Sequence, residues 1–438
     1  MIIGGDAAGL SAATQIRRHQ PEASIGVLEK GNVISYGACG LPYFIGGEIE
    51  KLDDLVFFTP EKFSAQYRCD LKIKHEVIAI EPSSQTVIAR SDDGERKFRY
   101  DYCMLATGAH AVQLPMALPD QKSIFYLKTI QDAAQIKERL AKLPAQEIAI
   151  IGAGYIGLEM VEAFTSLGHR CAVLDMAATP VPRLHPTIGK RLVKMLEEKN
   201  IPFYGNCKIE STSIKDQKVE IETDSETFRA DLLLVAPGIR PATDFLTDTE
   251  IKTNRGAVEI NRFGQTSVEN IYAGGDCAMV YHRLLQKNVY HPLGSTANKQ
   301  GRIAGLNLSG QKLSFPGIIG MQIFKFFDIV VGSCGIDPET GKANNLDIKA
   351  VAARRSSRAG YYPGGEPVDL SLYVNSSNRT IVGGHLMGPL ESSQLIDVIG
   401  VMAQTEVNVD EAAWFDAAYA PPVAPVWNAL LSAAGKYK

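Results

Sequence analysis

Ile150-Ile151-Gly152-Ala153-Gly154-Tyr155-Ile156-Gly157 is the stretch of sequence that decides the fold. It follows an apolar run and precedes apolar residues at helical spacing, so it joins a strand to a helix. Gly152 allows the tight turn, Gly154 lets the backbone approach a pyrophosphate, and Gly157 permits close packing of helix and strand. Asp175 ends the next strand, 23 residues beyond Gly152, where an acid would hold a ribose diol. The pattern predicts a dinucleotide-binding unit rather than a structural glycine turn, with NADH as the favoured ligand and NADPH as the alternative.

A second, less regular motif stands at the start of the chain, in Gly4-Gly5-Asp6-Ala7-Ala8-Gly9. Its outer glycines have the spacing of a dinucleotide-binding turn, but Asp6 occupies the position of the middle glycine. Glu29 follows 25 residues after Gly4, at the end of the next strand-like run, and would be the ribose acid. Only three residues precede Gly4, so the first strand is short for its role. The alternatives are that the natural start lies upstream and that the fold accommodates a clipped strand. The chain therefore contains two candidate nucleotide-binding units in succession.

Two later segments are strand-like and end in short motifs. Residues 102–108 end in Ala106-Thr107-Gly108, and residues 266–276 end in Gly275-Asp276. Either is also compatible with an ordinary strand followed by a turn. Together with two dinucleotide folds, they resemble the two-dinucleotide flavoprotein superfamily, in which FAD binds the first fold and NAD the second. The resemblance implies that Asp276 binds the ribityl and phosphate portion of the flavin.

Cys39 is the cysteine that this arrangement singles out, because it lies about ten residues after the ribose acid Glu29. The next cysteine is Cys69, so Cys39 has no CxxxxC partner. A lone redox thiol can form a mixed disulfide with a small thiol, or it can be oxidised to a sulfenic acid. The alternative is a buried structural cysteine in a glycine-rich loop. A redox role requires a thiolate, and we expect neighbouring dipoles and the flavin to lower the pKa of Cys39.

The segment Ser35-Tyr36-Gly37-Ala38-Cys39-Gly40-Leu41-Pro42-Tyr43 resembles the active-site segment of the single-cysteine disulfide reductases. These comprise coenzyme A-disulfide reductase, NADH-dependent persulfide reductase, NADH oxidase and NADH peroxidase. The resemblance extends to residues 297–302, 361–364 and 419–427. It implies a homodimer with shared active sites, in which Tyr361 and Tyr419 reach the partner's Cys39. The alternative for both tyrosines is packing within their own domain.

The resemblance also implies a set of cofactor-binding residues. For FAD and NAD(P)H they are Gly4, Ala8, Gly9, Glu29, Lys30, Val77, Ala106, Thr107, Gly108, Gly152, Gly154, Tyr155, Ile156, Gly157, Glu159, Asp175, Gly238, Gly275, Asp276 and Ala297.

The first helix suggests a coenzyme A site. Ser11, Gln15 and Arg18 are spaced so that they share one helix face, and Arg17 and His19 add donors at its end. In coenzyme A-disulfide reductases the matching positions bind the pantetheine and phosphates, beside Ser35 and with Asn298 as a further contact. The alternative is a solvated polar face.

Two departures weaken the transfer of this site from the family. Ala38 stands where some members have asparagine, and Trp427 stands where some have a basic residue. Oxidase and peroxidase members commonly carry a histidine in the first phosphate loop, and this loop has none. The balance favours an FAD-dependent NAD(P)H:disulfide oxidoreductase that reduces coenzyme A disulfide, persulfide or polysulfide through a Cys39 mixed disulfide. The alternatives are an NADH oxidase or peroxidase using a Cys39 sulfenic acid, and a flavin redox sensor or electron-transfer partner.

The predicted fold is α/β, with two Rossmann-like domains and a C-terminal α+β dimerisation domain. We place the FAD domain at residues 1–113 and 241–310, the NAD(P)H domain at 114–240 and the dimerisation domain at 311–438. The 438 residues include 45 basic and 49 acidic ones, a balance that argues against nucleic acid as a partner. Prolines interrupt the uncharged residues 417–435, which argues against a membrane span. Seven scattered cysteines indicate reduced thiols in the cytoplasm, and no metal site is expected.

Overall fold

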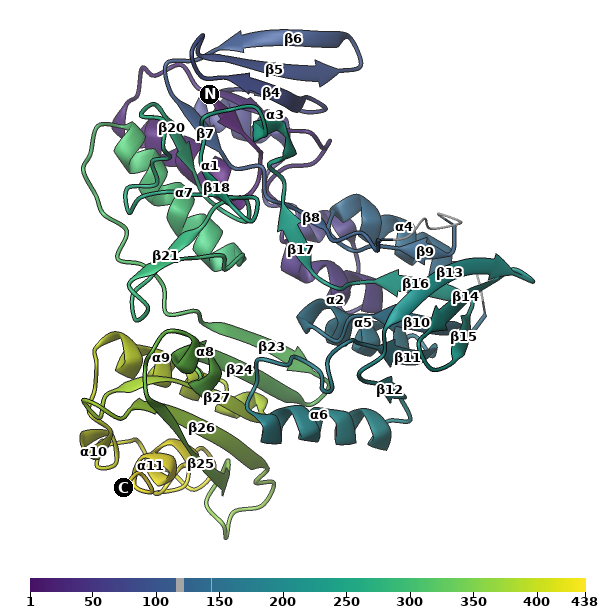
Figure 1. Ribbon diagram of the computed structural model, residues 1–438, viewed down its shortest axis with the longest axis vertical. Helices are drawn as coiled ribbons and strands as arrows, with labels where there is room; N and C mark the ends of the chain where they lie inside the picture. Colours follow the sequence, from purple (N-terminus) through teal and green to yellow (C-terminus); the bar gives the residue numbers. More distant parts are fainter. Residues whose placement is uncertain (116–121, 143) are drawn as a thin grey trace.

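The computed structural model describes residues 1–115, 122–142 and 144–438, and Figure 1 shows three bodies in it. The chain begins in the first body, continues into the second, on the right, and then returns to the first. The third contains the C-terminus. Two short antiparallel strands, β8 (Ala109–Ala111) and β17 (Ile239–Pro241), carry the chain between the first body and the second.

A five-stranded parallel sheet forms the first body, in the order β20-β7-β1-β2-β3. The first strand of this sheet, β1, has two residues. Helices α1 and α7 pack together so closely that a Cβ on Gly301 would lie 2.1 Å from the Ala8 carbonyl oxygen. An antiparallel sheet, β4-β5-β6, lies beside this layer. The bounds are β1 (Ile2–Ile3), α1 (Ala7–His19), β2 (Gly26–Leu28), α3 (Pro60–Tyr67), β3 (Asp70–Lys72), β4 (Glu76–Glu81), β5 (Thr86–Ser91), β6 (Gly94–Arg99), β7 (Cys103–Leu105), β18 (Thr253–Asn254), β19 (Ala257–Val258), β20 (Ile271–Ala273), β21 (Val280–His282), β22 (Lys287–Val289) and α7 (Gly294–Leu308).

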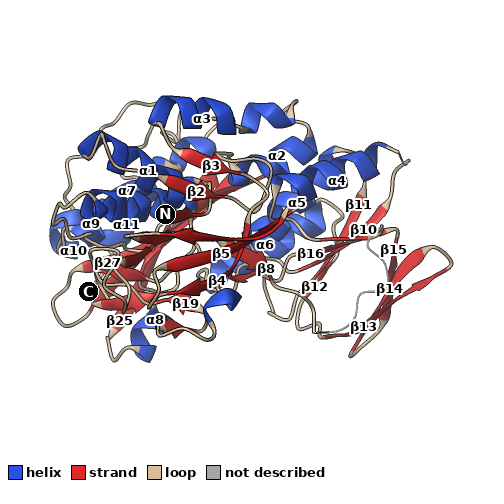
Figure 2. Ribbon diagram, turned by 90° about the horizontal axis from the view of Figure 1, so that it is seen from above, coloured by secondary structure: helices blue, strands red, loops and turns tan. Residues whose placement is uncertain are grey.

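The second body repeats this plan with a parallel sheet in the order β12-β11-β10-β16-β9. Buried aliphatic residues fill β10 and β16, as a sheet covered on both faces requires. Figure 2 shows the antiparallel sheet β13-β14-β15 beside it. The bounds are β9 (Ile124–Phe125), α4 (Ile130–Ala141), β10 (Glu147–Ile151), α5 (Tyr155–Ser166), β11 (Arg170–Leu174), α6 (Pro186–Glu198), β12 (Phe203–Tyr204), β13 (Ile209–Lys215), β14 (Lys218–Thr223), β15 (Thr227–Ala230) and β16 (Leu232–Val235).

The third body is an antiparallel sheet in the order β23-β24-β27-β26-β25, on which α9 and α11 pack. Residues 318–333 contain β23 and part of β24, and residues 369–387 contain parts of β26 and β27; a short turn separates the two paired strands in each case. The α/β class, with two parallel nucleotide-binding sheets and a C-terminal antiparallel-sheet domain, is confirmed. The bounds are β23 (Gln322–Phe326), β24 (Ile329–Gly335), α8 (Pro338–Ala343), β25 (Ile348–Ser356), β26 (Pro367–Asn375), β27 (Ile381–Pro389), α9 (Gln394–Gln404), α10 (Val409–Ala412) and α11 (Ala429–Ala434).

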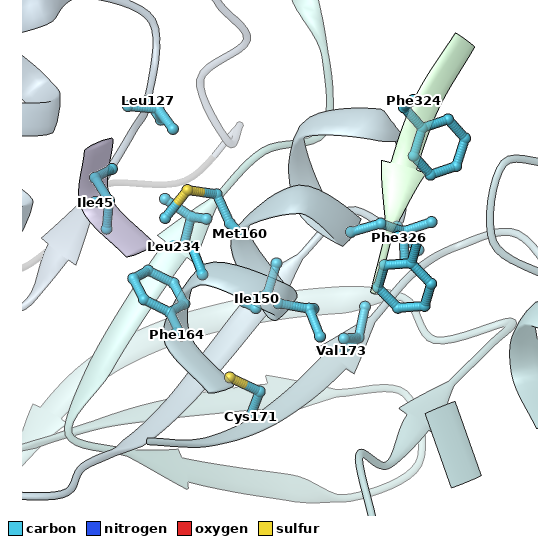
Figure 3. Packing of buried hydrophobic residues seen from close by; sticks show 14 of the residues in the cluster. Ile45, Leu127, Ile150, Met160, Phe164, Cys171, Val173, Leu234, Phe324 and Phe326 are labelled. Atoms are coloured by element: carbon cyan, nitrogen blue, oxygen red, sulfur yellow. The ribbon is translucent and has the colours of Figure 1, made fainter. Parts of the chain in front are cut away.

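One hydrophobic core joins the three bodies (Figure 3). Phe324 and Phe326 of β23 pack with Ile150 and Val173 of the second body, and Ile45 enters from the first. Polar contacts reinforce this junction: the Glu162 carboxylate accepts a hydrogen bond from the Phe327 N–H at 2.6 Å and pairs with Lys325. Apolar and polar contacts therefore connect the C-terminal domain to the second body.

No helix within the described ranges is long and apolar enough to cross a membrane. Residues 417–435, whose lack of charge raised that question, contain only the six-residue helix α11.

Candidate active site

Cys39 stands apart from the other cysteines of the chain. All seven are free thiols, but six are buried and Cys39 is exposed. It lies in a single 3₁₀ turn, Ala38–Gly40, which leads directly into helix α2 (Leu41–Gly46). The loop is anchored to a neighbouring segment by the hydrogen bond that the Gly37 N–H donates to the Leu55 carbonyl, at 2.8 Å. A firmly held and accessible thiol is the arrangement that sulfur chemistry with a ligand requires.

The charges around Cys39 act against the expected thiolate. Burial of the sulfur raises the pKa of Cys39, and the carboxylate of Glu159 raises it further. Lys128 opposes this effect, whereas Asp276 and Asp6 add to it. The protein groups alone therefore raise the pKa of Cys39, because burial of the sulfur and the nearby carboxylates outweigh Lys128. A lowering of this pKa by the bound flavin stays a prediction.

Both glycine-rich turns have the shape that a dinucleotide requires. Gly4 and Gly152 have φ values of 110° and 103°, and a Cβ on them would lie 2.1 and 2.4 Å from the carbonyl oxygens of Ala106 and Ala236. Gly154, in contrast, faces open space, with nothing within 4 Å of its Cβ position. That space lies at the N-terminus of α5, where backbone N–H groups favour a phosphate. The residues present fit a dinucleotide at each turn.

The two expected ribose acids are oriented by the backbone of the same turns. Glu29 accepts hydrogen bonds from the N–H groups of Gly5 and Gly31 at 2.7 and 2.6 Å. Asp175 accepts hydrogen bonds from Ala153 and Ala177 at 2.6 and 2.7 Å. These bonds fix each carboxylate at the edge of its turn, where a nucleotide ribose would approach.

Three of the expected FAD contacts lie close together, where α1, α7 and the end of β20 meet. Ala8, Gly275 and Ala297 meet, since a Cβ on Gly275 would lie 3.1 and 3.5 Å from the Cβ atoms of the two alanines. Asp276 forms an ion pair with Lys128 at 3.0 Å, and Lys128 is a residue that the sequence reasoning missed.

The other predicted FAD and NAD(P)H contacts lie around these turns. Lys30 forms an ion pair with Glu76 at 2.6 Å. Val77 follows Glu76 in the sequence and is partly buried against the core of the first body. The Thr107 hydroxyl donates a hydrogen bond to the Ala242 carbonyl at 2.8 Å. The remaining predicted residues are placed as follows: Gly9 and Gly157 inside the first turns of α1 and α5, Ala106 after β7, and Gly108 and Gly238 at positive φ beside the β8–β17 link.

Tyr155 and Glu159 occupy the first turns of α5 and face different neighbours. The Tyr155 hydroxyl donates a hydrogen bond to Gln322, and its ring packs edge-on against Phe324, with centroids 4.9 Å apart. Burial raises the pKa of Glu159 to about 7, against the opposing effect of a hydrogen bond from Tyr43. Ile156, the third predicted residue here, packs against the shared core.

A cavity of about 320 Å³ opens on the polar face of α1. Ser11, Gln15 and Arg18 line it together, as their spacing predicted, and Ser35 brings it to the Cys39 loop. Asn298 lines it as well, next to Arg302 one turn further along α7. The sequence reasoning missed Arg302 and the aromatic wall, although Arg302 follows Asn298 at helical spacing. The aromatic residues of the wall are Tyr36, Phe57, Phe58, Phe63 and Tyr67.

Arg17 and His19 do not contribute to this cavity, contrary to the expectation. The Arg17 guanidinium donates hydrogen bonds to the backbone carbonyls of Tyr67, Pro21 and Arg68, which tie α1 to α3. The His19 ring pairs with Gln311 at 2.9 Å. Both side chains are engaged in structural contacts, so Arg18 and Arg302 are the basic residues that line the cavity.

Tyr361 and Tyr419 form an exposed pair on the third body. Their hydroxyl groups are 2.6 Å apart, and 75% and 46% of their surfaces are exposed. The alternative that they are packed inside their own domain does not fit these exposed fractions. Trp414 and Trp427 are exposed nearby in the chain and pack edge to face, with centroids 6.2 Å apart.

Among the described residues, no group of three or more histidine, cysteine or acidic side chains has the geometry to hold a metal ion.

Two dinucleotide turns and one accessible thiol fit a flavoprotein that takes electrons from NAD(P)H. Residues 1–301 match the family described as pyridine nucleotide-disulphide oxidoreductase, and residues 321–430 match its dimerisation domain. The chain belongs to the pyridine nucleotide-disulphide oxidoreductase family. It is an NAD(P)H-dependent flavoprotein oxidoreductase and resembles the coenzyme A-disulfide reductases.

Its relatives differ in the reactions that their names state. The chain is 33% identical over 436 residues to the CoA-dependent NAD(P)H sulfur oxidoreductase of Pyrococcus abyssi, covering 98% of this chain and 96% of that one. It is 30% identical to an NADH oxidase of Methanocaldococcus jannaschii (99% and 97% covered) and to the coenzyme A disulfide reductase of Staphylococcus haemolyticus (96% and 95% covered). The structure of an NAD-dependent persulfide reductase from A. fulgidus superimposes with a TM-score of 0.95 at 32% identity, covering 99% of this chain and 82% of that one.

Proposed function

We propose that this protein reduces a disulfide or persulfide of coenzyme A through a mixed disulfide at Cys39. The observation that carries the proposal is the cavity along α1, which connects a cationic, polar wall to the loop of the one exposed cysteine. The proposed substrate class agrees with the names of two relatives, a CoA-dependent NAD(P)H sulfur oxidoreductase and a coenzyme A disulfide reductase.

The cavity offers complementary chemistry to each part of coenzyme A. Arg18 and Arg302 provide guanidinium groups for phosphates, since arginine binds phosphate oxygens through paired N–H donors. Ser11 and Gln15 offer hydrogen-bonding groups to the amides of a pantetheine arm. Ser35 brings the arm to the turn that contains Cys39. The volume of about 320 Å³ is within the range of small-molecule sites.

The chain's own residues would then perform thiol–disulfide exchange. When bound, NADH and FAD supply the electrons. The Cys39 sulfur attacks one sulfur of the substrate disulfide, and the S–S bond breaks with release of one thiolate. A mixed disulfide between Cys39 and coenzyme A remains, and two electrons convert it to the second thiolate and the Cys39 thiolate. Asp175 would hold the nucleotide ribose and favour NADH, because a carboxylate repels a 2′-phosphate.

The anaerobic consumption of NADH tests the proposal directly. With purified FAD-loaded protein, we expect NADH oxidation to depend on added coenzyme A disulfide or persulfide and to release coenzyme A thiol in stoichiometric amounts. Rapid NADH oxidation with oxygen, together with none on either sulfur substrate, would establish the NADH oxidase alternative instead. Slow turnover with every acceptor would favour the sensor or electron-transfer alternative.

Arg18→Gln is expected to raise KM for coenzyme A disulfide by about 10- to 100-fold with a smaller change in kcat. The reason is that a hydrogen bond to a charged group contributes about 1.5–3 kcal/mol. Reduction of a small disulfide without phosphates, such as cystamine, should be unchanged. Lys62→Gln is the matched control, since it removes one positive charge from exposed surface on α3. An equal loss on both disulfides would mean that Arg18 does not recognise the phosphates.

Mixing two impaired variants tests whether the active sites are shared in a homodimer. One chain carries Cys39→Ser, and the other carries Tyr361→Phe with Tyr419→Phe. If the tyrosines serve the partner's Cys39, a heterodimer contains one complete site, and we expect about half the wild-type activity per dimer. Tyrosines that serve their own subunit would leave the heterodimer no more active than the tyrosine variant alone. Tandem affinity tags isolate the heterodimer for the assay.

A further inference from the structure

The loop between β11 and α6, residues 176–185, is bonded to the second glycine-rich turn. Ala153, the middle residue of that turn, makes two hydrogen bonds through its backbone. Its N–H donates to the Asp175 carboxylate at 2.6 Å, and its carbonyl accepts from the Val181 N–H at 3.0 Å. The position of this loop therefore acts directly on the turn that we expect to hold the NADH pyrophosphate.

Val181 gives the loop a strained backbone. Its φ of 45° lies in the left-handed region, which a β-branched residue rarely adopts, and its side chain is buried. Such a conformation persists only where surrounding contacts hold it. Towards α6, the Leu184 N–H donates to the Val181 carbonyl at 2.9 Å, and His185 is the last residue before the helix. The strained loop therefore needs a firm contact at its end.

A buried histidine of the third body supplies that contact. The His185 backbone N–H donates a hydrogen bond to Nδ1 of His385, in β27, at 2.7 Å. The Tyr373 hydroxyl lies 2.9 Å from the same nitrogen, and His385 is only 5% exposed, so the bond is shielded from water. An ion pair between Arg191 of α6 and Asp369 of β26 joins the same two bodies (Figure 1).

The direction of the hydrogen bond defines the form of the His385 ring. A backbone N–H can only donate, so Nδ1 carries no proton and the ring proton is on Nε2. The Tyr373 hydroxyl must then also donate to Nδ1. Burial lowers the pKa of His385 to about 4, although the charge of Asp337 acts in the opposite direction. At neutral pH the ring is therefore uncharged, and Nδ1 stays available as an acceptor.

We propose that His385 is a positioning residue for NADH, which holds residues 176–185 against the second glycine-rich turn through the His185 N–H. The inference concerns the NADH half of the reaction. It rests on the expected nucleotide site beside Asp175 and does not depend on the sulfur substrate. The C-terminal domain then contributes to coenzyme affinity within its own subunit, without touching the coenzyme.

NADH binding by three variants of the FAD-loaded protein tests this role. His385→Leu removes the acceptor, whereas the amide oxygen of His385→Asn lies close to the position of Nδ1 and keeps one. Anaerobic stopped flow gives the Kd for NADH and the limiting rate of flavin reduction. We expect His385→Leu to raise this Kd about 10-fold, as the loss of one buried hydrogen bond implies. Its limiting rate should stay near that of the wild type, and His385→Asn should restore most of the affinity.

Tyr373→Phe is the matched control, because it removes the other donor to Nδ1 and leaves the bond to His185. It should lower the unfolding temperature and bind NADH like the wild type. Hydrogen–deuterium exchange without coenzyme gives a readout that does not depend on activity. Backbone amides of residues 176–190 should exchange faster in His385→Leu than in the wild type, His385→Asn or Tyr373→Phe.

A second pair of variants tests the donor if His385→Leu is unstable. His185→Pro removes the N–H itself, and the φ of −52° at this position is one that proline adopts. His185→Ala keeps the N–H and loses only the side chain. We expect the proline variant to raise the Kd for NADH and the alanine variant to leave it unchanged.

Two results would overturn the role of His385. One is a His385→Leu protein with the wild-type Kd for NADH and wild-type exchange in residues 176–190. The other is an equal loss of NADH affinity in His385→Leu, His385→Asn and Tyr373→Phe, which would mean general damage to the third body. Turnover with coenzyme A disulfide at saturating NADH is measured in parallel. Failure of the proposed substrate would leave the differences in NADH binding intact, so the two failures are distinguishable.

Discussion

Cys39→Ser is expected to abolish disulfide reduction, with a loss of about 10⁴-fold or more, because the nucleophile that forms the covalent intermediate is removed. NADH-dependent reduction of ferricyanide should remain within about twofold of the wild type, since the cofactor turns do not involve this side chain. Intact mass should show one coenzyme A per chain on the oxidised wild-type protein and none on the variant. Anaerobic kinetics and mass spectrometry of the same preparations check both expectations.

Cys69→Ser is the control for this experiment. Cys69 is the next cysteine in the chain and is buried, with 8% of its surface exposed. We expect it to retain disulfide reduction and the coenzyme A adduct, although its stability will be lower because a buried thiol becomes a hydroxyl. Substantial disulfide reduction by Cys39→Ser would show that another group carries the exchange.

Gly152→Ala is expected to destabilise the second body by about 3 kcal/mol or more. The new Cβ would lie 2.4 Å from the Ala236 carbonyl oxygen, and the φ of 103° is unfavourable for alanine. Strained backbone costs about 1–3 kcal/mol and overpacking adds a similar amount. Thermal unfolding should begin at a lower temperature, and NADH-dependent flavin reduction should be lost. Limited proteolysis within residues 122–240 provides a local measure of the damage.

Gly154→Ala separates strain from ligand binding at the same turn. Nothing lies within 4 Å of its Cβ position, so this variant should unfold at nearly the wild-type temperature. The added methyl group would occupy the space proposed for the pyrophosphate and should raise KM for NADH by about tenfold or more. If Gly152→Ala and Gly154→Ala unfolded at the same temperature, the conclusion that a Cβ clashes at Gly152 but not at Gly154 would be wrong.

The fold was predictable because its determinants are local. Each glycine-rich turn, with the acid that ends the next strand, lies within about 30 residues, a span over which spacing alone constrains geometry. Ser11, Gln15 and Arg18 belong to one helix, so their common orientation also followed from spacing. The isolation of Cys39 from other cysteines was visible in the sequence, and the structure adds that it is the exposed one.

What could not be predicted depends on contacts between distant segments. Phe63 and Tyr67 reach the cavity because α3 packs beside α1, and Arg17 donates a hydrogen bond to a carbonyl 50 residues away. The pKa of Cys39 is raised rather than lowered because burial and carboxylates from separate elements surround its sulfur. Asp6 was visible as a departure from the glycine pattern, but its contact with the backbone N–H of Tyr36 depends on how that distant loop folds.

The junction at β23 has a consequence for how such proteins can be recombined. Tyr155, which begins the helix after the second glycine turn, is held by Gln322 and Phe324 of the C-terminal domain, and Glu162 holds the backbone of Phe327. A chimera that takes its C-terminal domain from a relative therefore also replaces the neighbours of the nicotinamide-side helix. Exchanging these segments as one block, residues 155–162 with 322–327, should preserve coenzyme use, whereas exchange of the C-terminal domain alone should alter it.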